Sequence, residues 1–172
     1  MDRTAREPYT AVTPSILREG DIWRMWYVSG VRWVEIEGNM ELVYVIKYAT
    51  SVDGIVWERP NHVCIEQRHS LEAYAHPTVV ARNGRYHMWF SVRDSRDFRD
   101  GAGAYRIGYA VSPDGLTWER RDAEGGLGVS ADGFDSTMTA YPFAVEADGR
   151  LHLFYNGNGF GQGGIGYAVW ED

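Results

Sequence analysis

Short runs in which apolar and polar residues alternate dominate this chain, and glycine-containing turns separate one run from the next. Alternation with a period of two is typical of strands that bury one face. Four dipeptides are strong hairpin signals: Asp53-Gly54, Asn83-Gly84, Asp114-Gly115 and Asp148-Gly149. No segment keeps a 3.6-residue period. The pattern therefore predicts an all-β protein with little helix.

A threefold internal repeat organises these runs. Three segments share a starting proline and a closing aromatic triplet, and their prolines lie 63 and 65 residues apart. The segments are Pro14–Tyr27, Pro77–Phe90 and Pro142–Tyr155. A second unit follows each of them and ends in a Tyr-Ala pair, namely Tyr48-Ala49, Tyr109-Ala110 and Tyr167-Ala168. Repeats of this length are typical of arrays and propellers.

Each repeat is predicted to form four short antiparallel strands, which is the signature of a propeller blade. Two copies continue into a Ser-x-Asp-Gly-x-x-Trp unit that ends in Trp57 or Trp118. We expect one β-propeller-like domain over residues 1–172, with blades over about 9–60, 72–122 and 135–172. A β-sandwich built from a duplicated hairpin is the alternative.

Propeller connectivity predicts which end of the strands carries function. The tight Asp-Gly and Asn-Gly turns share one face, so the start of each first strand and the longer connections lie on the other. These connections are Val31–Val43, Arg93–Ala104 and Asn156–Gly164. Function concentrates on loops that a rigid scaffold holds. The face with the longer connections is therefore the candidate.

Composition excludes several classes. The net charge is −7, and every basic residue except Lys47 is arginine, without a basic run. Nucleic acid is therefore not an expected partner. No apolar stretch is long enough to span a membrane, and no signal segment is recognisable near Met1, so we expect a soluble cytoplasmic protein. One cysteine, Cys64, and scattered histidines give no metal-binding spacing, so we expect no metal and no cofactor.

The repeated motifs resemble the five-bladed β-propeller glycosidase superfamily, and within it the family 43 and 130-like glycoside hydrolases. The resemblance rests on units such as Met25-Trp26-Tyr27, Met88-Trp89-Phe90, Arg106-Ile107-Gly108-Tyr109-Ala110 and Phe154-Tyr155-Asn156-Gly157. It extends over about Tyr9 to Trp170. It implies a carbohydrate or glycoside ligand. The Ser-x-Asp-Gly-x-x-Trp units are similar to sialidase Asp boxes, which are structural turns.

The resemblance also implies that blades are missing. Family members have five blades, and this chain matches the C-terminal three. Family 43 enzymes carry their general-base Asp on the first blade, and no residue here corresponds to it. Three blades leave sheet faces or edges uncovered. We therefore expect either a fragment of a longer chain or a homo-oligomer that closes the ring.

Two acids are the candidate catalytic pair, because glycoside hydrolysis needs two carboxyl groups across the scissile bond. Glu72 precedes Pro77 and is expected to face the central channel. Asp135 precedes Pro142 in the corresponding place of the third repeat. The alternative interpretation of both is a solvated loop carboxylate. Pairing of Arg93 with Asp94 or Glu72, merely to order the face, is a further alternative.

Seven other side chains are candidates for contacts with a sugar. His76 and Tyr141 directly precede the repeat prolines and are expected near the channel mouth, where a role in holding the inner strand is equally open. Guanidinium and amide groups bind hydroxyls and carboxylates, and an aromatic ring in a loop provides a stacking platform. The candidate substrate contacts are His76, Arg93, Asp94, Tyr141, Asn156, Asn158 and, in the first long loop, Trp33.

The sequence supports three functional hypotheses. The first is a glycosidase-like protein that hydrolyses a glycosidic bond with Glu72 and Asp135. The second is a noncatalytic carbohydrate-binding propeller. The third is a structural module that associates with a second copy. The motifs favour a glycosidase-like fold without fixing the enzymatic activity.

Overall fold

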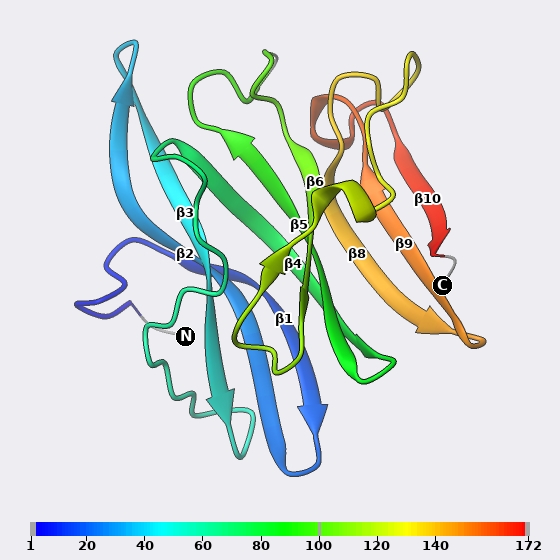
Figure 1. Cartoon of the computed structure of the whole chain (residues 1–172). Helices are drawn as coiled ribbons and strands as arrows, with labels where there is room; N and C mark the ends of the chain where they lie inside the picture. Colours follow the sequence, from blue (N-terminus) through cyan, green and yellow to red (C-terminus); the bar gives the residue numbers. More distant parts are fainter. Residues whose placement is uncertain (1–2, 100, 171–172) are drawn as a thin grey trace.

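The structure, a computed structural model, describes residues 3–99 and 101–170 and contains three antiparallel sheets side by side (Figure 1). The first sheet contains β1 (Ala11–Glu19), β2 (Ile22–Ile36) and β3 (Asn39–Ser51). The second contains β4 (Glu72–Arg82), β5 (Arg85–Asp94), β6 (Arg106–Ser112) and β7 (Glu119–Arg120). The third contains β8 (Ala140–Ala147), β9 (Arg150–Asn156) and β10 (Ile165–Trp170). Two 3₁₀ turns complete it, η1 (Asp122–Glu124) and η2 (Gly159–Gly161).

The first strand of each sheet lies innermost. Segments of β1, β4 and β8 together line an open cavity of about 480 Å³, the start of a central channel. Backbone amides of one inner strand donate to hydroxyls of its neighbour: Val79 N to Ser15 Oγ over 2.9 Å and Ala144 N to Thr78 Oγ1 over 3.0 Å. This arrangement confirms the predicted all-β, partial-propeller fold.

The number of strands per sheet differs from the prediction of four. Only the second sheet has four, and its fourth strand, β7, is two residues long. In the first sheet the fourth strand is reduced to two isolated bridges, Thr50↔Glu58 and Lys47↔Val63. In the described part of the third sheet there are three strands. The outer segments are short because the residues after the Asp-Gly turns form loops instead of extended pairs.

The two ends of the sheets differ as the connectivity predicts. Tight turns at Gly20, Gly84 and Gly149 join the first and second strands at one end, the lower one in Figure 1. The β2–β3, β5–β6 and β9–β10 connections lie at the other end, which we call the mouth face. The prediction of a long loop over Val31–Val43 was wrong, because β2 and β3 pair almost to a Glu37-Gly38 turn.

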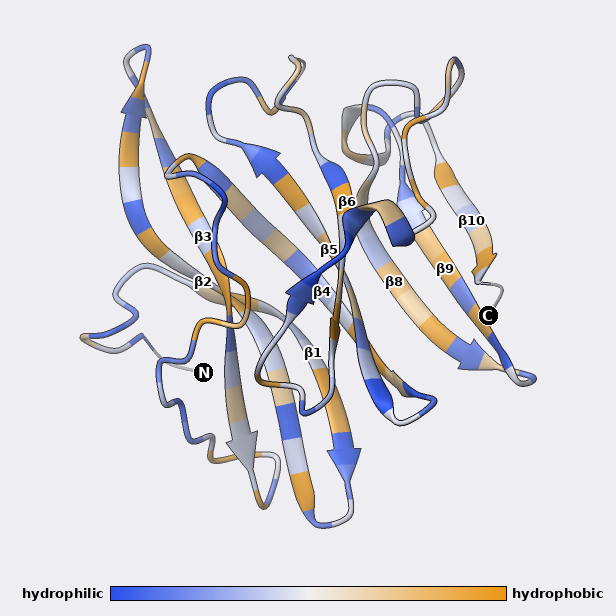
Figure 2. Cartoon of the chain, viewed as in Figure 1, coloured by the Kyte–Doolittle hydropathy of each residue, from blue (hydrophilic) through white to orange (hydrophobic). Residues whose placement is uncertain are grey.

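Apolar side chains pack between neighbouring sheets. Figure 2 shows that apolar residues occur along the strands of all three sheets. Trp26 of β2 is fully buried between the first and second sheets, and its Nε1 donates to Gly115 O over 2.8 Å. Trp89 of β5 is fully buried between the second and third sheets, and its Nε1 donates to Gly125 O over 3.3 Å. Trp26 thus ties the first sheet to a turn of the second, whereas Trp89 donates to the turn that follows β7 in its own sheet.

The Ser-x-Asp-Gly-x-x-Trp units form two turns with the same hydrogen bonds. Asp114 Oδ1 accepts from Leu116 N and Thr117 N, each over 2.8 Å, and Trp118 Nε1 donates to Gly115 O. Asp53 makes the corresponding bonds in the first unit. The side chains therefore replace backbone partners inside the turn, as expected for structural Asp boxes.

We predict that Gly115→Ala destabilises the protein more than Gly149→Ala. Both glycines have φ near +70°, so each substitution costs about 1–2 kcal/mol of backbone strain. A Cβ at Gly115 would also lie 2.9 Å from Trp26, whereas none of the described atoms lies within 4 Å at Gly149. Overpacking should add about 1–3 kcal/mol to the Gly115 loss in urea unfolding. Equal losses for the two variants would contradict this role of the turn.

Candidate functional site at the mouth face

A strained backbone position lies at the mouth end of every inner strand. Thr13, His76 and Tyr141 have φ values of +46°, +49° and +53°, and each coincides with a register shift in β1, β4 or β8. Left-handed conformations of non-glycine residues cost about 1–3 kcal/mol each and cluster at functional sites. The repetition of this strain at one face singles out the mouth as the candidate site.

Five side chains, which we call the mouth cluster, meet at this face: His76, Arg93, Tyr105, Tyr141 and Phe160. The rings of His76 and Tyr141 lie 5.7 Å apart, and those of Tyr141 and Tyr105 lie 5.6 Å apart. Tyr105 also lies 5.9 Å from Phe160 and 6.0 Å from Arg93 Cζ. The structure thus brings together three predicted candidates, His76, Arg93 and Tyr141, from two different sheets.

Arg93 is the buried cation of this cluster. Its side chain is 3% exposed, and the residue opposite it in β4 is the small Ala73, which leaves room beside the strand. Nη2 donates to Leu42 O over 2.9 Å, Nη1 donates to Ser95 Oγ over 3.1 Å, and the Phe98 ring lies 3.7 Å from Cζ. No ion pair with Asp94 or Glu72 forms, so Arg93 does not order the face in that way.

The partners of Arg93 leave part of its donor capacity unused. A guanidinium has five N–H groups, and among the described residues the buried Nε has no hydrogen-bond acceptor. Within residues 3–99 and 101–170, no carboxylate forms an ion pair with Arg93. A positive charge held only by a carbonyl, a hydroxyl and aromatic rings raises the electrostatic potential of the mouth.

The tyrosines of the cluster remain neutral phenols. Burial raises the pKa of Tyr105, and Arg93 opposes that change without cancelling it. Burial also raises the pKa of Tyr141. Both hydroxyls are therefore protonated at neutral pH and are able to donate a hydrogen bond to a bound oxygen.

The loop after β9 presents Phe160 to solvent. Phe160 has φ +61° within η2 and is exposed, and its carbonyl accepts from Asn156 Nδ2 over 3.2 Å. Asn158 Oδ1 accepts from Thr137 N and Met138 N. The two asparagines thus fix the loops of the third sheet, and their predicted role as direct sugar contacts stays a prediction.

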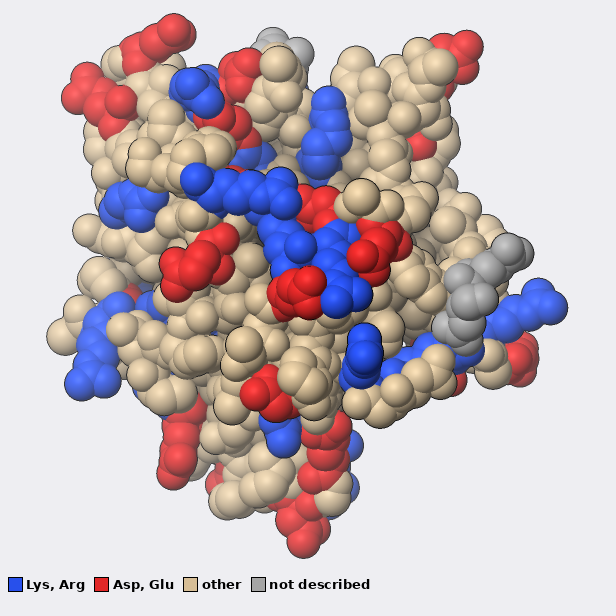
Figure 3. All heavy atoms as spheres, in the orientation of Figure 1, with Lys and Arg blue, Asp and Glu red and all other residues tan. Residues whose placement is uncertain are grey.

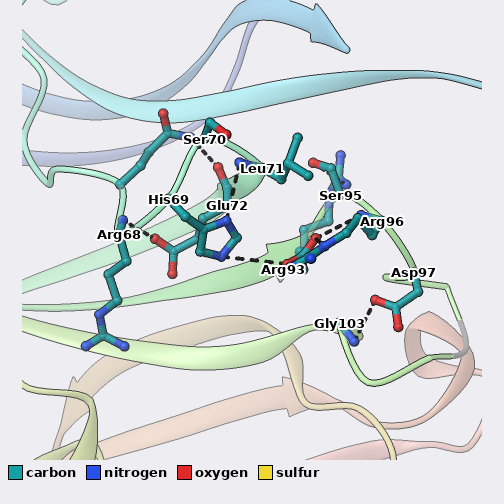
Figure 4. A network of polar contacts seen from close by, with 12 residues as sticks. Arg68, His69, Ser70, Leu71, Glu72, Arg93, Ser95, Arg96, Asp97 and Gly103 are labelled. Carbon is teal, nitrogen blue, oxygen red and sulfur yellow. Dashed lines mark hydrogen bonds and ion pairs between the residues drawn. The ribbon is translucent and has the colours of Figure 1, made fainter. Parts of the chain in front are cut away.

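Figure 3 shows basic and acidic side chains gathered together near the centre of the face in view. Glu72 lies in a second polar network beside the mouth (Figure 4). Its Oε1 accepts from Arg120 Nη1 over 2.8 Å, and its Oε2 accepts from Tyr74 OH over 2.6 Å and from Arg68 N over 2.7 Å. The expectation that Glu72 faces the channel was wrong, because Arg120 of the outer strand β7 holds the buried carboxylate.

This network keeps Glu72 ionised. Burial by itself raises the pKa of Glu72, but hydrogen bonds from Tyr74, the Arg68 backbone and Arg120 outweigh burial and lower the pKa below its ordinary value. A carboxyl group that is ionised at neutral pH is not a proton donor. The contacts of Glu72 are those of a structural ion pair, and its predicted catalytic role stays a prediction.

Asp135 lies in another network. It is buried and accepts from Tyr155 OH over 2.7 Å. Hydrogen bonds from Ser130 and Tyr155 lower the pKa of Asp135. Asp135 and Glu72 thus bind different partners in different sheets, and the hypothesis of a catalytic pair rests on sequence alone.

Asp94 and Trp33 have their partners outside the mouth cluster, although Asp94 lines one pocket with Arg93 and Glu72. Asp94 accepts from Arg96 Nε over 3.0 Å and lies 3.7 Å from His69 Nε2, and the hydrogen bond from Arg96 lowers the pKa of Asp94. The placement of Trp33 in a loop was wrong, because it lies within β2 and pairs with Leu42. Its exposed ring contacts Tyr9 edge-on, 6.2 Å between centroids.

Sequence reasoning missed three aromatic members of the site and its surroundings. Tyr105 directly precedes the repeated Arg106–Ala110 unit, while Phe98 and Phe160 lie in loops without a repeat signal. One signal existed: Tyr44 and Tyr105 each precede the Tyr of the Tyr-Ala pair by four residues, and both lie against Arg93. The cluster draws its members from three strands and two connections that are far apart in the chain, so only the fold reveals it.

Two absences apply to the described residues. Within 3–99 and 101–170, no group of three or more His, Cys, Asp or Glu side chains is placed to hold a metal ion. Over the same ranges, none of the helices has the length and apolar character needed to cross a bilayer.

We predict that Glu72→Gln lowers the free energy of unfolding by about 1.5–3 kcal/mol, because Arg120 and Tyr74 lose a charged hydrogen-bond acceptor and Arg120 keeps Asp122 as its other carboxylate partner. A carboxyl with a lowered native pKa stabilises the fold above its unfolded pKa, and this contribution disappears as pH falls through the native pKa. The free energy of unfolding, measured in urea, should therefore fall more for wild type than for the variant between about pH 5 and pH 3.

The exposed ion pair of Glu124 with Arg121 provides the matched control. Glu124→Gln should change the unfolding free energy by about 0–1 kcal/mol. If Glu72→Gln is as stable as the control at neutral pH, the structural interpretation of Glu72 is wrong.

Comparisons with known sequences give two uncharacterized relatives. Two proteins of Mycobacterium tuberculosis, from strains CDC 1551 / Oshkosh and ATCC 25618 / H37Rv, are each 38% identical to the chain over 168 residues. The alignment covers 97% of this chain and 53% of each relative, so the chain spans about half the length of the curated relatives it matches. No protein-family model matches the chain.

Solved structures give the fold. A family 117 glycoside hydrolase of Zobellia galactanivorans matches 100% of this chain and 56% of its own, with a TM-score of 0.76 and 17% identity. A family 32 β-fructofuranosidase mutant of Bombyx mori, in complex with sucrose, matches 91% of this chain and 33% of its own, with a TM-score of 0.63 and 17% identity.

A third neighbour, a family 43 β-xylosidase/α-arabinofuranosidase from a compost metagenome in complex with xylotriose, has a TM-score of 0.57. It is 12% identical and matches 84% of this chain and 42% of its own. Such low identities establish the fold and leave the activity open. The chain has the propeller-like fold of glycoside hydrolases.

Proposed function

We propose that this protein is a glycosidase-like protein that binds a carbohydrate at the mouth of its central channel. The carrying observation is the mouth cluster, in which aromatic rings surround a buried arginine beside three strained inner strands. Sugar rings stack their C–H faces on aromatic rings, while phenol and guanidinium groups bind hydroxyl oxygens. The neighbouring channel cavity of about 480 Å³ has room for a small saccharide.

The exposed and the buried members of the mouth cluster have different roles in the proposed binding. Phe160 and, less fully, His76 and Tyr141 are open to solvent and supply the surface on which a sugar rests. Tyr105 and Arg93 are buried behind them and set the charge and the position of these rings. Solved neighbours that hold sucrose or xylotriose support this ligand class by fold analogy alone.

Hydrolysis of a glycosidic bond by Glu72 and Asp135 is the finer form of this proposal. A noncatalytic binding role is favoured by one observation: both acids are buried, ionised and hydrogen-bonded to other side chains. We further propose that the chain forms one propeller-like domain, with blades over about 9–60, 72–122 and 135–172. In longer proteins such as the relatives, further chain would complete the ring.

We predict that Phe160→Ala and Tyr141→Ala each weaken saccharide binding about tenfold, because each removes stacking area from an aromatic rim. Titration calorimetry with xylotriose, sucrose and a panel of oligosaccharides measures this. Ile55→Ala, an exposed residue in a turn at the opposite end, is the control and should bind as wild type does. If Trp33→Ala abolishes binding while Phe160→Ala and Tyr141→Ala bind as wild type does, the sugar stacks on Trp33 and the mouth cluster is not the binding site.

For catalysis, we predict that Glu72→Gln and Asp135→Asn leave turnover of an aryl-glycoside panel unchanged after correction for the folded fraction. The physical reason is that both carboxylates already accept hydrogen bonds from other groups of the chain. A general acid–base group contributes on the order of 100-fold or more to the rate. If turnover in either folded variant is lower than in wild type by such a factor, the two acids are the catalytic pair instead.

A further inference from the structure

The outward side of the third sheet carries two rows of side chains that cross all its strands. Register pairs Phe143 with Phe154 and Phe154 with Tyr167 in one row, and Val145 with His152 and His152 with Val169 in the next. Ile165 extends the surface on β10. We call this surface the outward face: Phe143, Val145, His152, Phe154, Ile165, Tyr167 and Val169.

The second sheet has the same rows, and there they are buried. Its rows are Thr78–Trp89–Tyr109 and Val80–His87–Val111. In both sheets a histidine Nδ1 lies 2.7 Å from a tyrosine hydroxyl, His87 with Tyr109 and His152 with Tyr167. The second-sheet rows pack against the third sheet, so they form a surface for packing between sheets.

Exposure separates the two sets of rows. Trp89 is 0% exposed and Tyr109 is 2% exposed, whereas the corresponding Phe154 and Tyr167 are 38% and 56% exposed. Figure 2 shows apolar residues interspersed with polar ones along β8, β9 and β10. A contiguous apolar sheet face of this kind marks an interaction site.

We propose that the outward face binds the outward face of a second copy of this chain. The two rows hold no Asp, Glu, Lys or Arg, and the next row on the same side adds one cation, Arg150 opposite Ala147, at the turn end, so the centres of two identical faces meet without repulsion between like charges. The rest of the chain carries a net charge of −7, which opposes contact between copies elsewhere. The two uncharged rows are therefore where two copies are able to approach.

The pairing is face to face rather than head to tail. In a head-to-tail arrangement the outward face would pack on the free side of the first sheet, where Tyr27 and Trp57 border a small apolar cluster. Glu7 covers that side: it accepts from Tyr27 OH over 2.8 Å and pairs with Arg59 over 2.9 Å and with Lys47 over 3.4 Å. Like-with-like pairing leaves these ion pairs intact and closes with twofold symmetry.

Light scattering after gel filtration tests the proposal, with the full chain over a range of concentrations. Wild type should be a dimer, and Phe154→Glu and Tyr167→Glu should raise the dimer dissociation constant about tenfold or more while circular dichroism stays unchanged. Ile55→Glu, which places the same charge at a position that is 82% exposed, should remain a dimer. A monomeric wild type at every concentration would overturn the proposal.

Cross-linking tests the geometry. Under air oxidation, Phe154→Cys should form a disulfide between two copies without a second variant, because Phe154 is central in the outward face and a twofold axis through that centre brings it near its own equivalent. The buried Cys64 should not react. A cross-link that forms only when Phe154→Cys is mixed with Trp57→Cys would contradict face-to-face pairing and establish the head-to-tail arrangement.

Discussion

The contact on which the arrangement of sheets depends is the indole of a central strand against a turn of the next sheet. Trp26 is fully buried and donates to Gly115 O, and that turn accommodates the ring only because residue 115 has no Cβ. Its φ of +77° reinforces the same requirement. One glycine thus satisfies both the turn and the packing of the adjacent sheet, which fixes how the inner strands face the channel.

The mouth cluster follows from that arrangement. His76 and Arg93 come from the second sheet and Tyr141 from the third, so their proximity requires the second and third sheets to keep their relative position. The amide of Tyr141 donates to Ser91 Oγ over 2.8 Å, which ties the strained start of β8 to the second sheet. Inter-sheet packing and the candidate site are therefore parts of one structure.

The same packing rule explains the polar network around Glu72 and the outward face. Arg120 lies on the short outer strand of the second sheet and neutralises a buried acid, which stabilises the mouth without taking part in it. The outward face has the pattern of a surface between sheets but meets solvent. Apolar side chains are buried between the first and second sheets and between the second and third sheets, but those on the outward side of the third sheet stay exposed.

The sequence by itself determined the all-β fold, the turns at one end and the candidates His76, Arg93 and Tyr141, because these follow from local alternation, hairpin dipeptides and the repeat. It did not determine the strands at Val31–Val43, the partner of Glu72 or the aromatic neighbours of Arg93. Those depend on contacts between residues far apart in the chain, such as Glu72 with Arg120 and Arg93 with Leu42. Only the tertiary structure decides them, because the energy of a buried charge depends on which groups the fold brings around it.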